Sequence, residues 1–427
     1  MYSSQRGRGR GRGSSSANRF ANSAPSTPLP AARDIMEGLR PSALQTISIP
    51  AAPATVKDIK ITNFESIGSY NWKNAASPTI IVPGSPPEWQ NKQTPYQVPP
   101  DTGIFFSDQN GFRMPQAVLL PLIVAVDKVQ SESANASNAG TFDWAAENID
   151  FITDRNGLRK LLRWIEDAGA NPESRNFRID LQLAGNTVLM NRWETETRVN
   201  YSGYTYGFNF EKASTDPAIG CEGSTGHHRV VKYDLDGLRM VVRFEVDACL
   251  PASAKAKSSG SAKASTIDDL VASLGEVKLG GASAKTTSTT THGLTVLPGG
   301  GSVSHSSLLE LTTRTERRAA EFDWKDAYPQ LFFSQTPHHF LAVHYQGRFS
   351  AVNKRQLGSS ELKGVERSIQ PGLRKLRVAL GVIRDLVVKH GERGRLTLVC
   401  RRGRMEVFER VSAESCLPDE VLARFEG

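Results

Sequence analysis

The sequence has few cysteines and no long hydrophobic run, and each absence excludes a class of protein. Its four cysteines are scattered without a C-x-x-C pair, so we expect neither a zinc ribbon nor a disulfide framework. The most apolar run, residues 117–126, contains Pro121 and is too short to cross a bilayer. The N-terminus lacks the apolar segment of a secretory signal. We therefore expect an intracellular protein without membrane association, in the nucleus or the cytoplasm, with a preference for the nucleus.

Acidic residues are absent from the first twenty positions, which hold five arginines. Much of the basic excess behind the formal net charge of +8 therefore lies at this end of the chain. Residues 1–55 are rich in Gly, Ser, Ala, Pro and Arg, a composition that buries too little apolar surface to fold. The RGRGRGRG repeat is typical of disordered arms that bind RNA, although such repeats also bind proteins or form solvated tails. We predict a disordered Arg/Gly-rich arm over these residues.

A second stretch of low complexity, residues 252–307, is rich in Ser, Ala, Lys, Gly and Thr. We expect a long disordered loop there. Before it, Asp236-Gly237 forms the turn of a predicted hairpin, and after it residues 308–315 are predicted as a strand. This pattern fits neighbouring strands joined by an expanded loop. Residues 56–427 are thus predicted to form one domain that the insertion interrupts.

The remaining sequence predicts both helices and strands. Residues 154–168 and 372–391 have the apolar spacing of amphipathic helices, and the second helix is expected to end at a glycine. Residues 393–411 are predicted as a hairpin, and a helix is predicted to begin after Glu211. The sequence therefore indicates the α/β class, of mixed α+β type, with a central mixed β-sheet flanked by helices.

Four acidic residues stand in or beside apolar or aromatic segments: Glu211, Glu245, Asp247 and Glu310. Glu245 and Asp247 share one face of a predicted strand, because side chains alternate along a strand. Burying a lone carboxylate costs several kcal/mol, whereas a cluster is tolerated around a cation. Carboxylate and carbonyl oxygens are the ligands of Mg²⁺ and Mn²⁺. From spacing alone, the alternative stays open that these acids face solvent or pair with nearby arginines.

Short motifs around these acids follow the order found in a known enzyme family. GFNFE ends in Glu211, EVD contains Glu245 and Asp247, ELT contains Glu310, and YPQLFFSQTP contains Gln330. This order resembles the decapping exoribonuclease (DXO-like) family, whose fold is related to the PD-(D/E)XK nucleases. The resemblance covers most of residues 142–350 outside the insertion. It implies a metal-dependent hydrolase that removes caps or pyrophosphate from RNA 5′ ends in RNA quality control, with 5′→3′ exonuclease activity as a further option.

The resemblance also implies roles for individual residues. The implied ligands of Mg²⁺ or Mn²⁺ are Glu211, Asp247, Glu310 and the carbonyl of Leu311. Glu245 and Gln330 join the three acids as implied catalytic residues. Residues implied to bind the RNA end and its phosphates are Arg155, Arg243, Arg314 and Gln330. The implied partners are RNA 5′ ends and, as an open option, a partner exoribonuclease.

One position departs from the family pattern. The family has E-L-K where this chain has Glu310-Leu311-Thr312. The lysine is expected to orient the attacking water and to stabilise developing negative charge, and threonine brings no charge. Arg314 lies two residues further along the same face, but arginine is a poor proton donor or acceptor. Three readings stay open: an active hydrolase, a weakened or inactive RNA-end-binding protein of the same fold, and a scaffold whose acids pair with arginines.

Overall fold

The computed structural model describes residues 29–51, 57–137, 142–166, 176–251, 288–412 and 414–426. The Arg/Gly repeat and most of the predicted insertion, residues 252–287, lie outside these ranges. Residues 32–427 pack as one unit.

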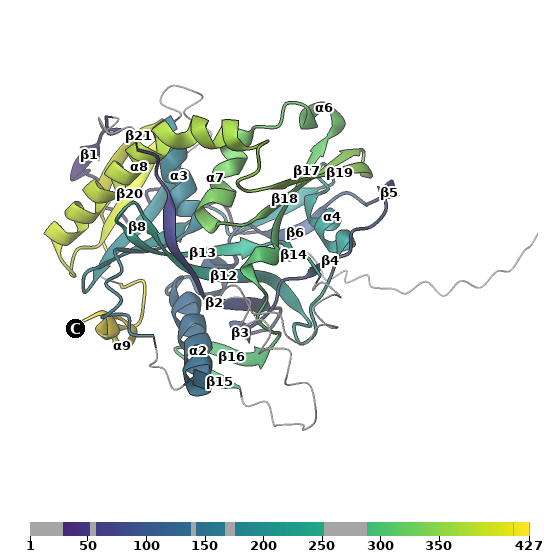
Figure 1. Ribbon diagram of the computed structural model, residues 1–427. Helices are drawn as coiled ribbons and strands as arrows, with labels where there is room; N and C mark the ends of the chain where they lie inside the picture. Colours follow the sequence, from purple (N-terminus) through teal and green to yellow (C-terminus); the bar gives the residue numbers. More distant parts are fainter. Residues whose placement is uncertain are drawn as a thin grey trace, which may run out of the picture. The chain divides into compact units, whose positions relative to one another are not determined.

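A large mixed sheet runs through this unit (Figure 1). Its twelve strands, in spatial order, are β1 (Gln45–Ile47), β21 (Arg404–Glu409), β20 (Leu396–Arg401), β8 (Phe177–Ala184), β9 (Thr187–Trp193), β7 (Phe151–Asp154), β13 (Arg239–Val246), β12 (Ser224–Leu235), β2 (Ile61–Lys73), β3 (Thr79–Pro83), β16 (Leu294–Gly299) and β15 (Thr289–Thr291). β7 pairs in parallel with β9 and β13, and β16 pairs in parallel with β3, whereas the other pairs are antiparallel. The predicted mixed sheet is therefore confirmed.

The helices of the unit are short, apart from α2 and α8. They are α1 (Gln109–Arg113), α2 (Leu120–Ser137), α3 (Arg155–Glu166), α4 (Gly207–Ser214), α6 (Glu316–Ala319), α7 (Trp324–Ser334), α8 (Lys363–His390) and α9 (Asp419–Leu422), with 3₁₀ turns η3 (His305–Ser307) and η4 (Ala423–Phe425). The two predicted amphipathic helices correspond to α3 and α8. α8 begins at Lys363, nine residues or about two and a half turns earlier than the predicted start at residue 372, and continues through Pro371. Glu211 lies inside α4 rather than ahead of a helix.

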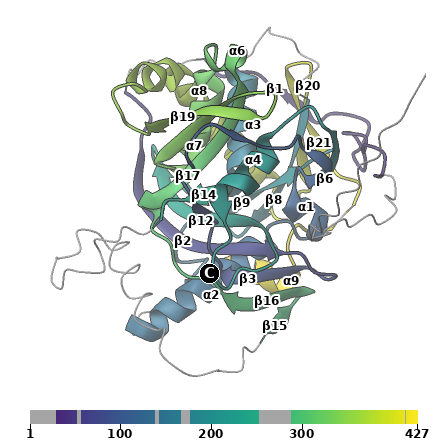
Figure 2. The ribbon, with the colours of Figure 1, turned by 90° about the vertical axis from the view of Figure 1, so that its right-hand side faces the viewer.

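Helices cover both faces of the large sheet (Figures 1 and 2). α3, α7 and α8 pack on one face and share a core with Val242, whereas α2 packs on the other face and shares a core with Val241. Neighbouring residues of a strand point to opposite faces, so β13 contributes to both cores. This explains why β13 is largely apolar, apart from Arg239, Arg243 and Glu245.

A second sheet has seven strands and includes the strand that carries Glu310. Its strands, in spatial order, are β11 (Thr215–Asp216), β4 (Glu88–Trp89), β14 (Ala248–Cys249), β17 (Leu308–Thr315), β18 (His338–Tyr345), β19 (Arg348–Gln356) and β5 (Tyr96–Gln97). β17 and β18 are parallel. A separate antiparallel pair joins β6 (Thr102–Phe106) to β10 (Arg198–Ser202). α4 packs on the seven-stranded sheet through Phe210, which is buried with Trp89 and Phe349.

Two segments predicted as disordered contain ordered strands. β15 and β16 fall within the predicted insertion, and Leu294 and Val296 of β16 are buried against the core. β1 falls within the predicted N-terminal arm and pairs with β21. In both places a short apolar alternation is surrounded by Ser, Thr, Gly and Pro, so the overall composition conceals it. The domain therefore begins earlier than predicted, and the insertion is shorter.

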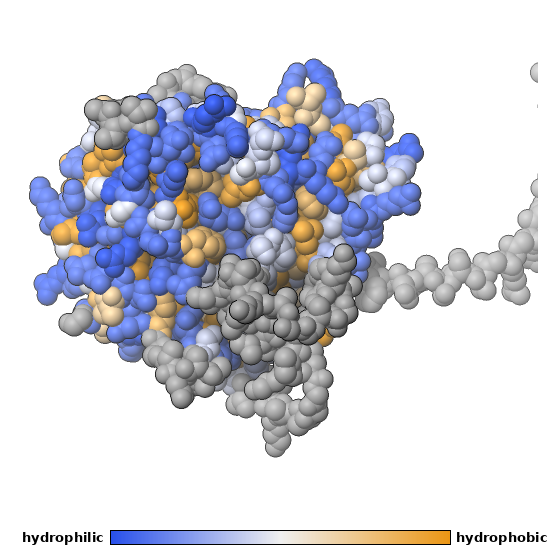
Figure 3. All heavy atoms as spheres, in the orientation of Figure 1, coloured by the Kyte–Doolittle hydropathy of each residue, from blue (hydrophilic) through white to orange (hydrophobic). Residues whose placement is uncertain are grey.

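None of the described helices is long and apolar enough to cross a bilayer. The face drawn in Figure 3 mixes hydrophilic residues with scattered apolar ones. All four cysteines are buried as free thiols.

Candidate active site

An uncovered edge of β17 forms one wall of the candidate site. β14 pairs only with Leu308 and Leu309, the first two residues of β17. Asp247 precedes β14 and lies along the edge beyond it, where its Oδ2 accepts a hydrogen bond from the N–H of Leu311 at 2.7 Å. The N–H and C=O of one residue in an extended strand point to the same side, so the Leu311 carbonyl faces this edge too. The Leu311 carbonyl, an implied metal ligand, is therefore on the same side as Asp247.

Helix α4 brings another acid to this edge. It lies beside β17, as Figures 1 and 2 show, and carries Glu211 in its second turn. A pocket of about 660 Å³ is lined by Glu211, Asp247, Glu310, Leu311 and Arg314, among others. This volume falls in the range of about 300–1,000 Å³ that is usual for ligand sites. Three distant parts of the sequence, namely α4, the β13–β14 junction and β17, thus place acids around one space.

The acids of this pocket repel one another. The pKa of Glu211 is raised to about 8, first because burial disfavours its charged form and then because Glu245, Glu310 and Asp101 carry like charges. The pKa of Asp247 is raised well above its ordinary value by burial and then by Glu310 and Glu211, while one backbone hydrogen bond lowers it. The charges that act most strongly on these two side chains are therefore negative. A nearby divalent cation would relieve this repulsion.

Glu245 belongs to the same group of charges but is not part of the pocket lining. It lies opposite His228 in the β12–β13 pair, and its Oε1 is 2.7 Å from the place that a Cβ on Gly226 would take. Its pKa is raised, chiefly because protein surrounds the carboxylate, whereas Arg192 and Arg155 lower it. The side chain nevertheless reaches solvent. The structure places Glu245 next to the pocket, and its catalytic role stays a prediction.

Glu310 is held by side chains from two helices. Arg155, the first residue of α3, forms a buried ion pair with it, with 2.9 Å between Nη1 and Oε2. Gln330 of α7 donates a hydrogen bond from Nε2 to the other carboxylate oxygen. Arg155 also donates to the hydroxyl of Ser334 and to the backbone carbonyl of Glu245, at 3.4 Å each. The sequence predicts that Arg155 and Gln330 contact RNA, whereas in the structure they contact Glu310.

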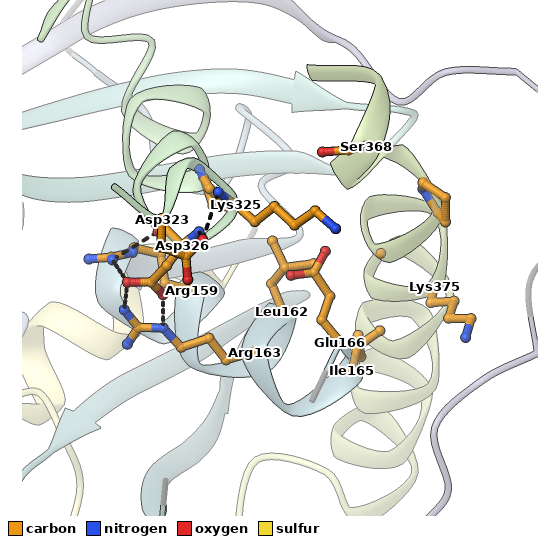
Figure 4. Close-up of a pocket in the computed structure, with 13 residues that line it drawn as sticks. Arg159, Leu162, Arg163, Ile165, Glu166, Asp323, Lys325, Asp326, Ser368 and Lys375 are labelled. Carbon is orange, nitrogen blue, oxygen red and sulfur yellow. Dashed lines mark hydrogen bonds and ion pairs between the residues drawn. The ribbon is translucent and has the colours of Figure 1, made fainter. Parts of the chain in front are cut away.

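Ion pairs between α3 and α7 fix this arrangement. Arg163 donates two hydrogen bonds to the carboxylate of Asp326, at 2.6 and 3.0 Å, and Arg159 lies 3.6 Å from the same group (Figure 4). Because these pairs are partly exposed, we attribute orientation rather than much stability to them. They hold together the two helices that carry Arg155 and Gln330. The pocket in Figure 4, of about 450 Å³, lies among α3, α7 and α8 and is lined by none of the predicted site residues.

Arg243 does not belong to the candidate site. Its fully buried guanidinium forms a two-pronged pair with Asp154, at 2.7 and 3.0 Å. It also donates to the hydroxyl of Tyr70 and to the backbone carbonyl of Val118. The prediction that Arg243 binds RNA is therefore wrong. The alternation along β13 predicts one solvent-facing side, but helices cover both faces of the sheet at this strand.

Thr312 occupies the position of the family's lysine. Its hydroxyl lies 3.1 Å from Nε2 of His339, which is buried on β18 directly beside Glu310 in the parallel register. Burial, helped by neighbouring arginines, lowers the pKa of His339 to about 4, so the imidazole is neutral at pH 7 and does not replace the lysine's charge. Arg314 does line the pocket, as predicted. Sequence reasoning missed His339, because neither strand alone reveals that β17 pairs with β18.

The donor set suits a hard divalent cation, although its present arrangement is not a finished metal site. Among the residues that the structure describes, no group of three or more His, Cys, Asp or Glu side chains is placed to hold a metal ion. Both carboxylate oxygens of Glu310 are engaged, by Arg155 and by Gln330. Carboxylates with a backbone carbonyl are nevertheless the oxygen ligands that Mg²⁺ and Mn²⁺ take. The uncompensated repulsion between Glu211 and Asp247 supports the fit.

Comparison with solved structures identifies the fold. The chain resembles Candida albicans Rai1, crystallised with pU5 and Mn²⁺, with a TM-score of 0.53 and 10% identity over 90% of this chain and 99% of that one. Scheffersomyces stipitis Rai1 gives a TM-score of 0.53 and 11% identity over 89% and 97% of the two chains. The same protein with (3′-NADP)⁺ and calcium gives 0.51 and 11% over 85% and 93%. The fold expected from the decapping exoribonuclease resemblance is thus confirmed.

The chain belongs to the family described as domain of unknown function DUF8563, which matches residues 42–425. No curated protein matches the chain.

Proposed function

We propose that this protein is a divalent-metal-dependent hydrolase of RNA 5′ ends, which removes caps or pyrophosphate and has 5′→3′ exonuclease activity as a further option. The observation that carries the proposal is the convergence of Glu211, Asp247 and Glu310, from three distant segments, on one pocket. Oxygen ligands beside open space suit phosphate chemistry, because Mg²⁺ and Mn²⁺ bind phosphate oxygens as readily as carboxylates.

The ligands of the structural neighbours support this choice of substrate. The Candida albicans protein was crystallised with an RNA, pU5, and Mn²⁺. The Scheffersomyces stipitis protein was crystallised with a dinucleotide, (3′-NADP)⁺, and calcium. By likeness of fold, we infer an RNA 5′ terminus as substrate and Mg²⁺ or Mn²⁺ as cofactor for this chain.

Each residue of the pocket has a role in this proposal. A bound Mg²⁺ or Mn²⁺ supplies Lewis-acid stabilisation and a more acidic water. Glu211, Asp247, Glu310 and the Leu311 carbonyl are the groups that would hold it. Arg155 and Gln330 orient the carboxylate of Glu310 through one hydrogen bond to each oxygen, which leaves a lone pair on each oxygen for a cation. Arg314 is placed to contact a phosphate of the RNA terminus.

Hydrolysis of defined RNA ends tests the proposal. Triphosphate-, NAD- and unmethylated-cap RNAs are incubated with the full-length protein in Mg²⁺, in Mn²⁺ and in chelator. We expect metal-dependent product from at least one RNA, and loss of that product in Asp247→Asn and Glu310→Ala. The matched control is Asp216→Asn, an exposed carboxylate on β11 that does not line the pocket. Product that persists in both site variants would overturn the assignment of the ligands.

A second function, RNA-end binding with weak or no turnover, is favoured by one observation. Thr312 and its neutral neighbour His339 leave the lysine's charge without a replacement at that position. Protein that binds 5′-monophosphate RNA in a metal-dependent way but yields no product would establish this alternative. A nuclear location and a docked exoribonuclease stay predictions of the sequence, which cell fractionation and co-purification would test.

A further inference from the structure

The lining of the candidate pocket is rich in tyrosine. Three of the nine tyrosines of the chain, Tyr201, Tyr204 and Tyr206, line the pocket that contains Glu211. Tyr204 is 88% exposed, the highest value among the exposed large aromatic residues of the described chain. An exposed aromatic ring beside an acidic pocket is available for contact with a ligand, because it is not used in the core.

The loop that carries Tyr204 is held in place from below. Asp101 is fully buried, and its carboxylate accepts hydrogen bonds from the hydroxyl of Thr205 and the N–H of Asn209, at 2.8 Å each. The backbone carbonyl of Asp101 accepts a further bond from the N–H of Gly203, at 2.9 Å. The residues on both sides of Tyr204 are therefore anchored to one buried residue, Gly203 to its backbone carbonyl and Thr205 to its carboxylate. The backbone that carries Tyr204 is held in place, so a ligand that contacts its ring orders little additional backbone.

Further aromatic rings support the same wall. Phe105 of β6 stacks on Phe208 of α4 with 4.2 Å between ring centroids, and Tyr201 of β10 packs edge-on against both. These residues join the small β6–β10 sheet to α4. Aromatic side chains on such a wall offer flat faces of the kind on which successive bases of single-stranded nucleic acid stack.

The charges of the pocket agree with a nucleic-acid ligand. Arg314 and Arg318 line it together with the tyrosines, and guanidinium groups bind phosphates. The acids lie in the same pocket, where a divalent cation would join them to a terminal phosphate. A strand entering with its 5′ phosphate toward Glu211 and Asp247 would bring its next bases to the tyrosine rim. A base-paired end would not fit this arrangement, because its bases already stack on one another inside the duplex.

We infer that Tyr204, on the loop that Asp101 holds at the pocket, is a stacking platform for an unpaired base close to the 5′ terminus. This inference rests on the proposed function and adds to it a residue that contacts a base beside the acids. Stacking on an aromatic ring is tolerant of sequence because every base has a flat face. The platform therefore selects unpaired ends without selecting a base.

Fluorescence anisotropy on the full-length protein tests the inference. The probe is a 5′-monophosphate RNA with a 3′ fluorophore, in Ca²⁺, with its integrity checked on a gel. A second probe has abasic second and third nucleotides, and a third is the same RNA in a blunt duplex. The variants are Tyr204→Ala, Tyr204→Phe and the control Tyr345→Ala, which removes another exposed tyrosine (64%) that does not line the pocket.

We expect Tyr204→Ala to weaken binding of the intact RNA about 5- to 100-fold, as for the loss of one stacked base. It should change binding of the abasic RNA little, while Tyr204→Phe and Tyr345→Ala bind like wild type. Wild type should bind the duplex more weakly than the single strand. Equal loss on intact and abasic RNA, or no loss on either, would overturn the inference. Failure of wild type to bind any RNA would instead refute the proposed function, so the two outcomes are distinguishable.

Discussion

Replacing Glu211 by glutamine should stabilise the metal-free protein at neutral and alkaline pH. The folded-state pKa of Glu211 is about 8, against an ordinary value of 4.5. Between these two pH values the folded protein binds more protons than the unfolded chain, so wild-type stability falls as pH rises from about 4.5 to about 8. Glutamine has no proton to bind, and the variant should not show this part of the decline.

The size of the effect follows from the same pKa. At pH 7 Glu211 stays protonated in the folded protein, whereas a glutamate of the unfolded chain is ionised. This difference in pKa lowers the free energy of unfolding of the wild type by about 3 kcal/mol at pH 7. Glu211 is half-buried, so water and relaxation of its neighbours reduce this figure. We expect Glu211→Gln to raise the free energy of unfolding by about 1–3 kcal/mol at pH 7, by a smaller amount at pH 6, and not at all below pH 4.5.

Thermal and chemical unfolding in chelator, at intervals from pH 4.5 to 8.5, measure this difference. The control is Glu37→Gln, which removes an exposed glutamate far from the pocket lining and should run parallel to wild type. In Mn²⁺ the order should reverse, because binding at 100 times the dissociation constant adds about 2.7 kcal/mol to wild type and less to the variant. A variant that is less stable than wild type at pH 8 in chelator would refute the repulsion on which the metal assignment depends.

Other variants test the remaining parts of the site. Arg155→Met should destabilise the protein by about 3–5 kcal/mol in urea unfolding, because it leaves Glu310 buried without its charged partner; stability equal to wild type would contradict the clamp. Thr312→Lys should raise kcat in Mn²⁺, by up to about 10²–10³-fold if the lysine's charge is what the site lacks, whereas Thr312→Met should not. Burial raises the pKa of Glu166 to about 7, so the melting temperature of Glu166→Gln should fall less than that of wild type as the pH rises from 4.5 to 7. Parallel curves of melting temperature against pH would contradict this.

The acids of the pocket could be predicted from the sequence, because each one interrupts an apolar strand or an aromatic segment. Asp247 directly follows β13 and Glu310 lies within β17; the apolar patterns of both strands are clear, and both strands exist where expected. The sequence predicts the helix around Glu211 only in part, since its N-cap residue, Tyr206, makes no capping hydrogen bond with its side chain. The local sequence pattern thus identifies the candidate ligands, but it does not give the bounds of every helix that carries them.

The partners of these acids depend on packing that local pattern does not record. Arg155 and Gln330 meet at Glu310 because α3 and α7 lie side by side on the sheet, and nothing in either segment specifies the other. Arg243 was misassigned for a related reason: the alternation in β13 is the same whether its polar side faces water or a buried carboxylate. Only the second core, formed by α2, decides that Arg243 pairs with Asp154.

A functional site and a structural ion network differ in whether each buried acid has a positively charged partner. In a scaffold whose acids only serve structure, a buried acid would have a cationic partner, as Asp154 and Glu310 do, or hydrogen-bond donors, as Asp101 does. Glu211 and Asp247 differ, because the charges that act most strongly on them are other acids. Repulsion of this kind destabilises the fold and is characteristic of sites where a cation or a substrate completes the charge balance. The pocket is therefore electrostatically incomplete at the point where Asp247 and the Leu311 backbone line the uncovered edge of β17.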